Sequence, residues 1–196
     1  MTDFDKILSE GVSITSSGTT GTPKTIYRSP DNLKKVIEVA IKAQNLTSDS
    51  KVLAVTRMTH AGGLLTQSLP AYTLGCNLKI QQFNAYTFLK DFKDYTHTFL
   101  TPAHMWALMQ TKDFVNADLE GKHILGGSDP VSWEMIEAFT SKGATVQPNW
   151  GMSEVGPITI NATFDSRSVI SYYKSLSVGS ILGDKFYTKW KIEDGV

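Results

Sequence analysis

Short strand-like runs alternate along this sequence with segments whose apolar residues recur at helical spacing. The run at residues 52–55 is continuously apolar with a β-branched bias, which suits a strand buried on both faces, as in a parallel sheet. Further strand-like runs lie at residues 78–81, 96–100, 123–125 and 144–148. Strands and helices in this rhythm predict an α/β fold with a doubly wound, mostly parallel sheet.

Helix start signals separate the strand-like runs. Ser29 is a typical N-cap and Pro30 suits the first helical position, so a helix is expected from Pro30 to about Asn45. Pro70 is an objection to a straight helix within the apolar stretch at residues 64–74. Further helices are expected at residues 85–92, after Thr101-Pro102 and after Asp129-Pro130.

After Pro157 the sequence becomes rich in strand-forming residues. Strands are expected at residues 158–163, 177–181 and 186–192. Residues 166–177 are polar, contain five serines and predict a loop. The length suits one domain over residues 1–196, with an α/β core at residues 1–157 and a β-rich tail at residues 158–196.

Two further strands, at residues 12–16 and 24–28, are expected to enclose a loop rich in glycines and hydroxyls. Glycines let backbone N–H groups approach a ligand closely, hydroxyls donate hydrogen bonds, and a lysine adds a mobile positive charge, so the loop suits a polyphosphate. Its candidate binding residues are Thr15, Ser16, Ser17, Gly18, Thr19, Thr20, Gly21 and Lys24. Pro23 takes the place of a glycine in the GxxxxGK[ST] P-loop, which excludes that motif. An ordinary polar turn between strands is the alternative.

A second polar motif follows the strand expected at residues 144–148. It consists of Asn149, Trp150, Gly151, Met152, Ser153 and Glu154. Trp150 offers a stacking face for a base and Ser153 a hydroxyl for a phosphate oxygen. Glu154 offers the oxygen ligand that Mg²⁺ prefers. A polar turn that carries a core tryptophan is the alternative.

Two shorter candidates follow other expected strands. Gly126, Gly127 and Ser128 form a turn whose bare backbone would let a flat ligand lie close, although a turn with Asp129 as N-cap explains them fully. His60 also follows a strand, where a helix cap or a packed ring is the alternative. Because ligands sit beyond the carboxyl ends of parallel strands, these residues and the second motif should converge on one crevice.

Composition narrows the class of protein. Nineteen basic residues balance nineteen acidic ones, so no net charge recruits nucleic acid or an anionic membrane. Cys76 is the sole cysteine and cannot form an internal disulfide. The first ten residues lack the apolar core of a signal peptide, and no apolar run approaches the ~20 residues of a membrane span. We expect a cytoplasmic protein without nucleic-acid or membrane partners.

The two main motifs, in this order, resemble the signature of the AMP-forming acyl- and aryl-CoA synthetases, a family of adenylate-forming ligases. Residues 16–24 follow the family's S-S/G-G-T-T-G-x-P-K loop at nearly every position. Trp150 and Ser153 replace the usual tyrosine and threonine of its Y-G-x-T/S-E motif and keep the ring and the hydroxyl. Glu154 matches the acidic residue that binds the metal in that family.

Four weaker features complete the resemblance. The turn at residues 126–130 is similar to the family's G-G-small-x-P turn, and His60 with Gly63 resembles its H-x-x-G turn. Residues 177–179 and the D-G pair at residues 194–195 look like the family's S-V-G turn and the end of its later strand. The resemblance therefore covers the chain from about residue 14 to about residue 195.

The resemblance implies the core of the family's large domain, binding ATP or AMP and Mg²⁺. In that family, ATP and a small carboxylic acid form an acyl-adenylate and pyrophosphate, and the acyl group then passes to a thiol such as coenzyme A. The implied contacts to the β- and γ-phosphates are Ser16, Thr19, Thr20 and Lys24. Ser153 would contact the α-phosphate, and Glu154 would hold Mg²⁺. The implied catalytic residues are Lys24, His60, Ser153 and Glu154, and the implied adenine pocket includes Gly126, Gly127 and Ser128.

Family members usually carry a long region before the phosphate loop, and a T-G-D segment and a small lid domain with a catalytic lysine after the D-G pair. We expect a minimal version without these parts, working slowly alone, as a homo-oligomer or with a separate lid protein. Loss of one preorganised charge donor commonly costs ~10²–10³ in rate. A non-catalytic module that binds ATP, AMP or an acyl-adenylate is the alternative. Four residues suggest an apolar acyl or aryl acid: Leu64, Met105, Trp106 and Met152.

Overall fold

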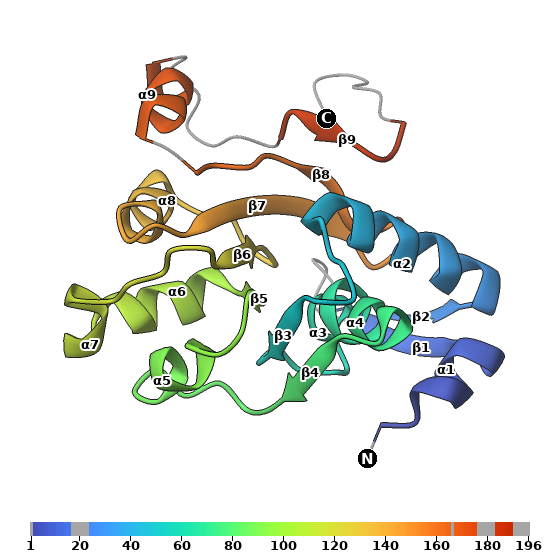
Figure 1. Ribbon diagram of the computed structural model, residues 1–196. Helices are drawn as coiled ribbons and strands as arrows, with labels where there is room; N and C mark the ends of the chain where they lie inside the picture. Colours follow the sequence, from blue (N-terminus) through green and yellow to red (C-terminus); the bar gives the residue numbers. More distant parts are fainter. Residues whose placement is uncertain (1, 17–23, 166, 176–182, 190–196) are drawn as a thin grey trace.

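The computed structural model describes residues 2–16, 24–165, 167–175 and 183–189, and within these ranges a seven-stranded sheet forms the centre of the molecule (Figure 1). Its strands are β3 (Lys51–Ala54), β4 (Asn77–Ile80), β5 (His97–Leu100), β6 (His123–Gly126), β7 (Thr145–Met152), β8 (Gly156–Asn161) and β9 (Lys185–Phe186). They lie in the order β4-β3-β5-β6-β7-β8-β9. Neighbours from β4 to β7 pair in parallel, whereas β8 and β9 add antiparallel strands at one edge. The predicted mostly parallel sheet with a β-rich C-terminal segment is confirmed.

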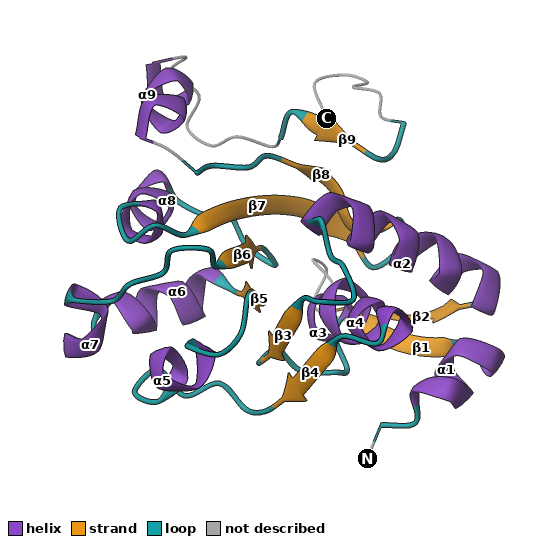
Figure 2. Cartoon of the chain, viewed as in Figure 1, coloured by secondary structure: helices purple, strands orange, loops and turns teal. Residues whose placement is uncertain are grey.

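Helices cover both faces of this sheet (Figure 2). They are α1 (Phe4–Glu10), α2 (Pro30–Gln44), α3 (Ala61–Gly63), the π-helix η1 (Leu64–Ser68), α4 (Leu69–Leu74), α5 (Phe88–Phe92), α6 (Pro102–Met109), α7 (Lys112–Val115), α8 (Trp133–Thr140) and α9 (Arg167–Ser175). Phe99 of β5 is buried with Ala40 of α2, whereas the next residue, Leu100, is buried with Met105 of α6 and Phe139 of α8. Because successive strand residues point to opposite faces, burial of both makes the sheet doubly wound.

The hydroxyl-rich loop belongs to a separate antiparallel hairpin of β1 (Val12–Ser16) and β2 (Lys24–Arg28). Ser16 pairs with Lys24 at the loop end of this hairpin, and Val12 pairs with Arg28 at the other end. The prediction of a loop between two strands is therefore confirmed. The loop residues Ser17, Gly18, Thr19, Thr20 and Gly21 lie outside the described residues, as do the motifs at residues 177–179 and 194–195.

The caps predicted for α2 are confirmed. The Ser29 hydroxyl accepts a hydrogen bond from the Asn32 N–H, and Pro30 occupies the first turn, where its missing N–H costs nothing. Asn45 ends the helix in the left-handed region, at a φ of 53°. The buried face is Leu33, Val36, Ile37, Ala40, Ala43 and Gln44.

The objection raised by Pro70 is also confirmed, because the helix around it changes type. The stretch runs as α3, the π-helix η1 and then α4, with Pro70 in the first turn of α4. Proline lacks the N–H that would donate to the carbonyl four residues earlier, that of Thr66. The buried side chain of Gln44 donates to the Thr66 oxygen instead, over 2.7 Å. A glutamine from α2 thus takes the place of the missing backbone donor.

Two predicted helices are present but begin later than expected. The helix expected after Asp129-Pro130 begins only at Trp133, and its N-cap is Ser132, so Asp129 does not cap it. Val131 instead packs on Gly126, where an added Cβ would lie 2.9 Å from its Cγ2, and the chain between these two residues bends at Ser128 and Asp129. The helix expected at residues 85–92 is shortened to α5, since Asn84 Oδ1 accepts from the Tyr86 N–H and holds a turn there.

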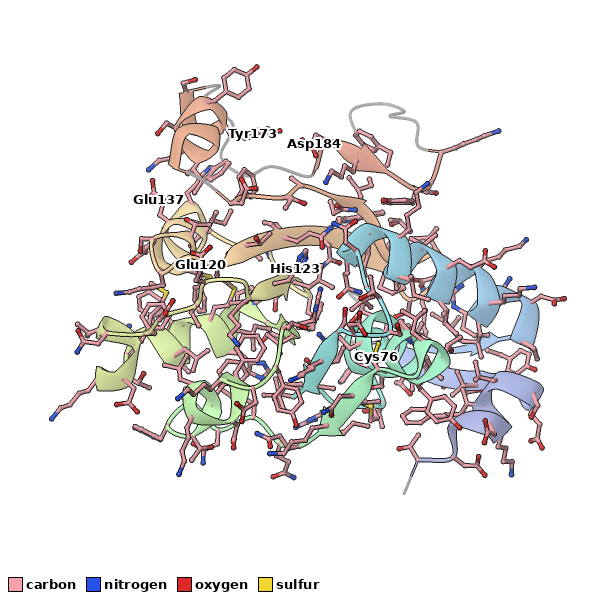
Figure 3. The ribbon with its side chains drawn as sticks, in the orientation of Figure 1. Cys76, Glu120, His123, Glu137, Tyr173 and Asp184 are labelled. Atoms are coloured by element: carbon pink, nitrogen blue, oxygen red, sulfur yellow. The ribbon has the colours of Figure 1, made fainter. Side chains whose placement is uncertain are left out.

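The loop predicted at residues 166–177 is wrong, because most of it forms α9. Ile170 is buried, and the Tyr173 ring meets Phe164 edge-on at a centroid distance of 5.2 Å. The Tyr173 hydroxyl donates to Asp184 Oδ2 over 2.6 Å, and these two residues face each other in Figure 3. Tertiary packing against Phe164 and against Trp133 of α8 therefore outweighs the serine-rich composition.

The last predicted strand is shorter than expected. Of the strand expected at residues 186–192, the structure has only β9, Lys185–Phe186. Residues 187–189 are not in a strand, and residues 190–192 lie outside the described ranges.

Candidate functional site

A cavity of about 770 Å³ opens beyond the carboxyl ends of the parallel strands. Thr56 follows β3, Thr101 follows β5, and Ser128 follows β6. The cavity is lined by Thr15, Thr56, His60, Ala61, Gly62, Thr66, Phe99, Thr101, residues 128–131, residues 148–153 and Pro157. The predicted convergence on one crevice is therefore seen for His60, Ser128 and residues 149–153.

The structure brings most of the predicted site residues together, but not all of them. Those on the cavity wall are Thr15, His60, Ser128, Asn149, Trp150, Gly151, Met152 and Ser153. Gly126 and Gly127 lie directly behind Asn149 and form the back of this wall. Lys24 and Glu154 are exposed and stand outside the lining residues within the described part of the chain. The side chain of Ser16 lies outside what the structure describes.

The glycine turn after β6 is shaped by Asn149. Its Nδ2 donates to the Gly126 carbonyl oxygen over 2.6 Å, and a Cβ on Gly127 would lie 2.6 Å from the same nitrogen. Ser128 then adopts a left-handed φ of 78°, which is uncommon for serine. The absence of a side chain at residue 127 therefore serves the close approach of Asn149.

The second polar motif differs from its prediction in secondary structure. It was expected after a strand, but β7 continues through Met152 because β8 pairs with it in antiparallel register. The register shifts between Trp150 and Met152, and such a bulge re-aims neighbouring side chains. A Cβ on Gly151 would lie 2.5 Å from the Gly156 oxygen, so the bulge requires a glycine. The Trp150 ring stays 38% exposed beside the cavity.

His60 occupies the N-cap position of α3, but its side chain makes no capping hydrogen bond. The residue is exposed and lines the cavity, so its ring is not packed in the core. A Cβ on Gly63 would lie 2.4 Å from the Thr56 oxygen and 2.5 Å from the Arg57 oxygen. The glycine three residues after His60 therefore lets α3 start against the end of β3, and this places His60 at the cavity mouth.

The three other histidines stack on aromatic rings or on each other. The His104 ring stacks on Phe83 with centroids 4.0 Å apart. His97 and His123 stack on each other at 5.1 Å near the amino ends of β5 and β6, the edge opposite the cavity. Burial lowers the pKa of His97 to about 4, with a smaller contribution from His123, and burial also lowers the pKa of His123.

Arg28 is the residue that sequence reasoning missed. It is the last residue of β2, only 5% exposed, and its Nη2 donates to the backbone oxygen of Ser153. Burial lowers the pKa of Arg28, and the nearby Glu154 carboxylate partly offsets this effect. The available signal was a basic residue at the end of β2 that lies away from the hydroxyl-rich loop.

The described residues set two limits on ions and membranes. Nowhere in the described ranges do three His, Cys, Asp or Glu side chains gather closely enough to hold a metal ion. No described helix has both the length and the apolar character needed to cross a membrane.

The profile of the family described as "AMP-binding enzyme" matches residues 12–194. The chain therefore belongs to the AMP-binding enzyme family, which confirms the resemblance to adenylate-forming ligases.

Two curated relatives carry ligase names. Indoleacetate–CoA ligase of Aromatoleum aromaticum is 28% identical over 147 residues, which cover 73% of this chain and 29% of that protein. Acyl-CoA synthetase FUM10 of Gibberella moniliformis is 26% identical over 161 residues, which cover 78% of this chain and 29% of that protein. The chain thus spans less than a third of the length of these relatives.

Solved structures agree on the fold. The adenylation domain of a keto acid-selecting NRPS module, bound to a keto acyl adenylate, superposes with a TM-score of 0.73 at 17% identity and covers 83% of this chain and 33% of that one. The N-terminal domain of FACL13 from Mycobacterium tuberculosis superposes with a TM-score of 0.69 at 16% identity and covers 82% of this chain and 40% of that one. At these identities the likeness concerns the fold alone.

Proposed function

We propose that this chain binds ATP with Mg²⁺ in the strand-end cavity and activates a carboxylic acid to an acyl-adenylate. The observation that carries the proposal is the convergence of Thr15, His60, Ser128 and the 149–153 segment on one cavity of about 770 Å³. Pockets of this size suit small-molecule ligands, which occupy roughly 300–1,000 Å³. Membership of the AMP-binding enzyme family supports a nucleotide as the ligand. The geometry of the cavity supports this cavity as the place where the nucleotide binds.

The nucleotide would lie along the wall formed by the glycine turn and the end of β7. Adenine would rest against the turn from Gly126 to Ser128 and against the exposed ring of Trp150, which offers a stacking face. Ser153 would donate to the α-phosphate, and the hairpin loop that ends in Lys24 would hold the β- and γ-phosphates. Glu154 would hold Mg²⁺, which neutralises phosphate charge when it is bound.

In the reaction, a carboxylate oxygen attacks the α-phosphorus, and the bond from that phosphorus to the bridging oxygen of pyrophosphate breaks. No proton is transferred, so the residues have to align the two reactants and stabilise charge. His60 at the cavity mouth would orient the carboxylate. Transfer of the acyl group to coenzyme A would be a second step.

The acid would bind in the inner part of the cavity. Phe99, Val131 and Met152 line it with apolar surface, which favours an apolar acyl or aryl group. Of the four residues used to predict this preference, Met152 alone lines the cavity. Met105 and Leu64 are buried in the core, and Trp106 is exposed outside the cavity lining. The proposed preference for an apolar acid therefore depends on Phe99, Val131 and Met152.

The test is carboxylate-dependent exchange of labelled pyrophosphate into ATP, with Mg²⁺ and a pool of acyl and aryl acids. Exchange that disappears in both Lys24→Ala and Glu154→Ala would support adenylate formation. A pool of polar amino acids serves as the comparison for the apolar preference. Stimulation by that pool alone would contradict it.

A non-catalytic nucleotide-binding module, or a core that needs a second copy or a separate lid protein, is the alternative. Calorimetry with ATP and light scattering separate these possibilities. ATP binding without exchange in any acid would favour the binding module. Exchange that grows more than linearly with protein concentration would favour a homo-oligomer.

A further inference from the structure

We infer that Arg28 is a positioning residue that holds the Ser153–Glu154 turn against the phosphate-binding hairpin and thereby sets the metal affinity of Glu154. The inference rests on the proposed role of Glu154 in binding Mg·ATP, and it assigns a function to a residue outside the cavity lining. Three observations carry it: the contact that Arg28 makes, the place where its own backbone is anchored, and its burial.

The contact acts on Glu154 through the backbone. Arg28 Nη2 donates to the carbonyl oxygen of Ser153. That carbonyl and the N–H of Glu154 belong to one planar peptide unit, so a group that holds the oxygen also holds the direction in which the Glu154 chain leaves. Glu154 is itself exposed, and its carboxylate partly offsets the lowering of the Arg28 pKa by burial. The orientation of the carboxylate would then follow that of the turn.

The other end of Arg28 is anchored in the hairpin. Its backbone pairs with Val12, and a Cβ on Gly11 would lie 2.5 Å from the Arg28 oxygen, so the strand end is closely packed. Lys24 lies four residues earlier on the same strand and therefore on the same face, about 14 Å away along β2. The strand β2 thus carries both Lys24, which is proposed to bind phosphate, and Arg28, which contacts the Ser153–Glu154 turn.

The burial of Arg28 costs free energy, which argues against a purely structural role for this residue. Arg28 is 5% exposed, and its Nε is buried without a hydrogen-bond partner among the described residues. Placing a guanidinium in such a site costs free energy unless its donors are satisfied. An apolar residue of similar length would close the strand without this cost. Arginine brings several donors in a rigid planar group, which suits it to hold the Ser153 carbonyl oxygen in a fixed direction.

The first test measures the turn without any ligand. Hydrogen–deuterium exchange of the purified protein is compared with that of Arg28→Met and Arg28→Lys. We expect faster exchange of peptides that cover residues 152–156 in Arg28→Met, unchanged exchange over residues 97–100, and partial rescue in Arg28→Lys. Unchanged exchange over residues 152–156 in Arg28→Met would overturn the inference.

The matched control is Lys122→Met. Lys122 Nζ also donates to backbone oxygens, those of Lys93 and Tyr95, but at the sheet edge opposite the cavity. This variant loses a partly buried cation without touching the turn. If Lys122→Met loosens residues 152–156 as much as Arg28→Met does, the effect is general destabilisation and the inference fails.

The second test measures ATP affinity by calorimetry, with Mg²⁺ and with EDTA. Removing the group that orients a metal ligand typically costs 10–100-fold in metal affinity, so Arg28→Met should weaken ATP binding by at least about tenfold with Mg²⁺ and by less than about twofold in EDTA. Equal losses in both conditions would contradict a role through Glu154. If the unaltered chain binds no ATP, the proposed function fails, and the exchange experiment still decides whether Arg28 holds the turn.

Discussion

The side-chain nitrogen of Asn149 donates to the carbonyl oxygen of Gly126 over 2.6 Å and joins the end of β6 to β7 where the parallel pairing of these strands stops, at the cavity. These residues belong to two different sequence motifs, 23 positions apart. The hydrogen bond makes the glycine turn and the aromatic segment one wall.

Replacement of Gly127 by alanine should damage this wall. A Cβ there would lie 2.6 Å from Asn149 Nδ2, and such overpacking costs about 1–3 kcal/mol. Urea unfolding of Gly127→Ala, Asn149→Ala and the double variant measures the effect. We expect a smaller cost for Gly127→Ala in the Asn149→Ala background, because the clashing atoms are gone. Additive costs would contradict the contact.

Trp150 should report nucleotide binding. Its ring is 38% exposed at the cavity, so a stacked adenine would change its fluorescence. Base stacking on an aromatic side chain is worth roughly 1–3 kcal/mol, so Trp150→Ala should weaken ATP binding roughly 5–150-fold. Trp150→Phe should keep most of the affinity and lose the fluorescence change. Full affinity in Trp150→Ala would rule out stacking at this ring.

Replacement of Ser132 should lower the unfolding free energy, whereas replacement of Asp129 should hardly change it. The Ser132 hydroxyl accepts from the Met135 N–H at the start of α8, so Ser132→Ala should cost about 1 kcal/mol of unfolding free energy. Asp129 lines the cavity without capping the helix, so Asp129→Ala should change stability by less than about 0.5 kcal/mol. Chemical denaturation of both variants checks this order. A larger loss of unfolding free energy in Asp129→Ala than in Ser132→Ala would indicate that Asp129 caps the helix.

Two buried glutamines should respond oppositely to the same substitution. Both amide atoms of Gln67 are buried without hydrogen-bond partners within the described structure, and each such atom commonly costs about 1–3 kcal/mol. Gln67→Met should therefore raise the unfolding free energy. Gln44 donates to the oxygens of Ala40 and Thr66, so Gln44→Met should lower it. Thermal and urea unfolding measure both. Destabilisation by Gln67→Met would mean that its amide has a polar partner.

The stacked histidines should make the fold sensitive to acid. His97 has a pKa of about 4 in the folded chain against an ordinary value of 6.5, so the unfolded chain binds more protons between these values. Stability is therefore fully present above about pH 6.5 and is lost as the pH falls toward 4, by about 3 kcal/mol for this group.

Other groups around the pair shape this titration. His97 contacts the oxygen of Gln44 and the hydroxyl of Thr96, and His123 contacts Gln147 and is near Lys185. Urea unfolding of the native chain and of His97→Gln from pH 7.5 to pH 4 measures the slope. The variant should lose less stability over this range. Equal slopes would assign the acid sensitivity to other groups.

Local chemistry made much of the fold readable in advance. Ser29, Pro30 and Asn45 bound α2 because capping involves residues within a few positions of each other. Thr101 and Pro102 begin α6 in the same way. Strands β3, β5 and β6 were recognisable because apolar runs of strand length leave few other ways to be buried. The cavity motifs were recognisable because strand ends meet at one edge of a parallel sheet.

Long-range contacts account for what local patterns missed. Arg28 meets Ser153 across 125 positions, and no local pattern around residue 28 indicates that partner. The serine-rich segment of α9 becomes helical because Ile170 and Tyr173 pack against aromatic side chains of other elements. β7 continues through the aromatic motif because β8 supplies hydrogen-bond partners. Residues near in sequence thus specified the elements and the chemistry of the loops, whereas packing between distant segments specified where those elements end and which side chains face the site.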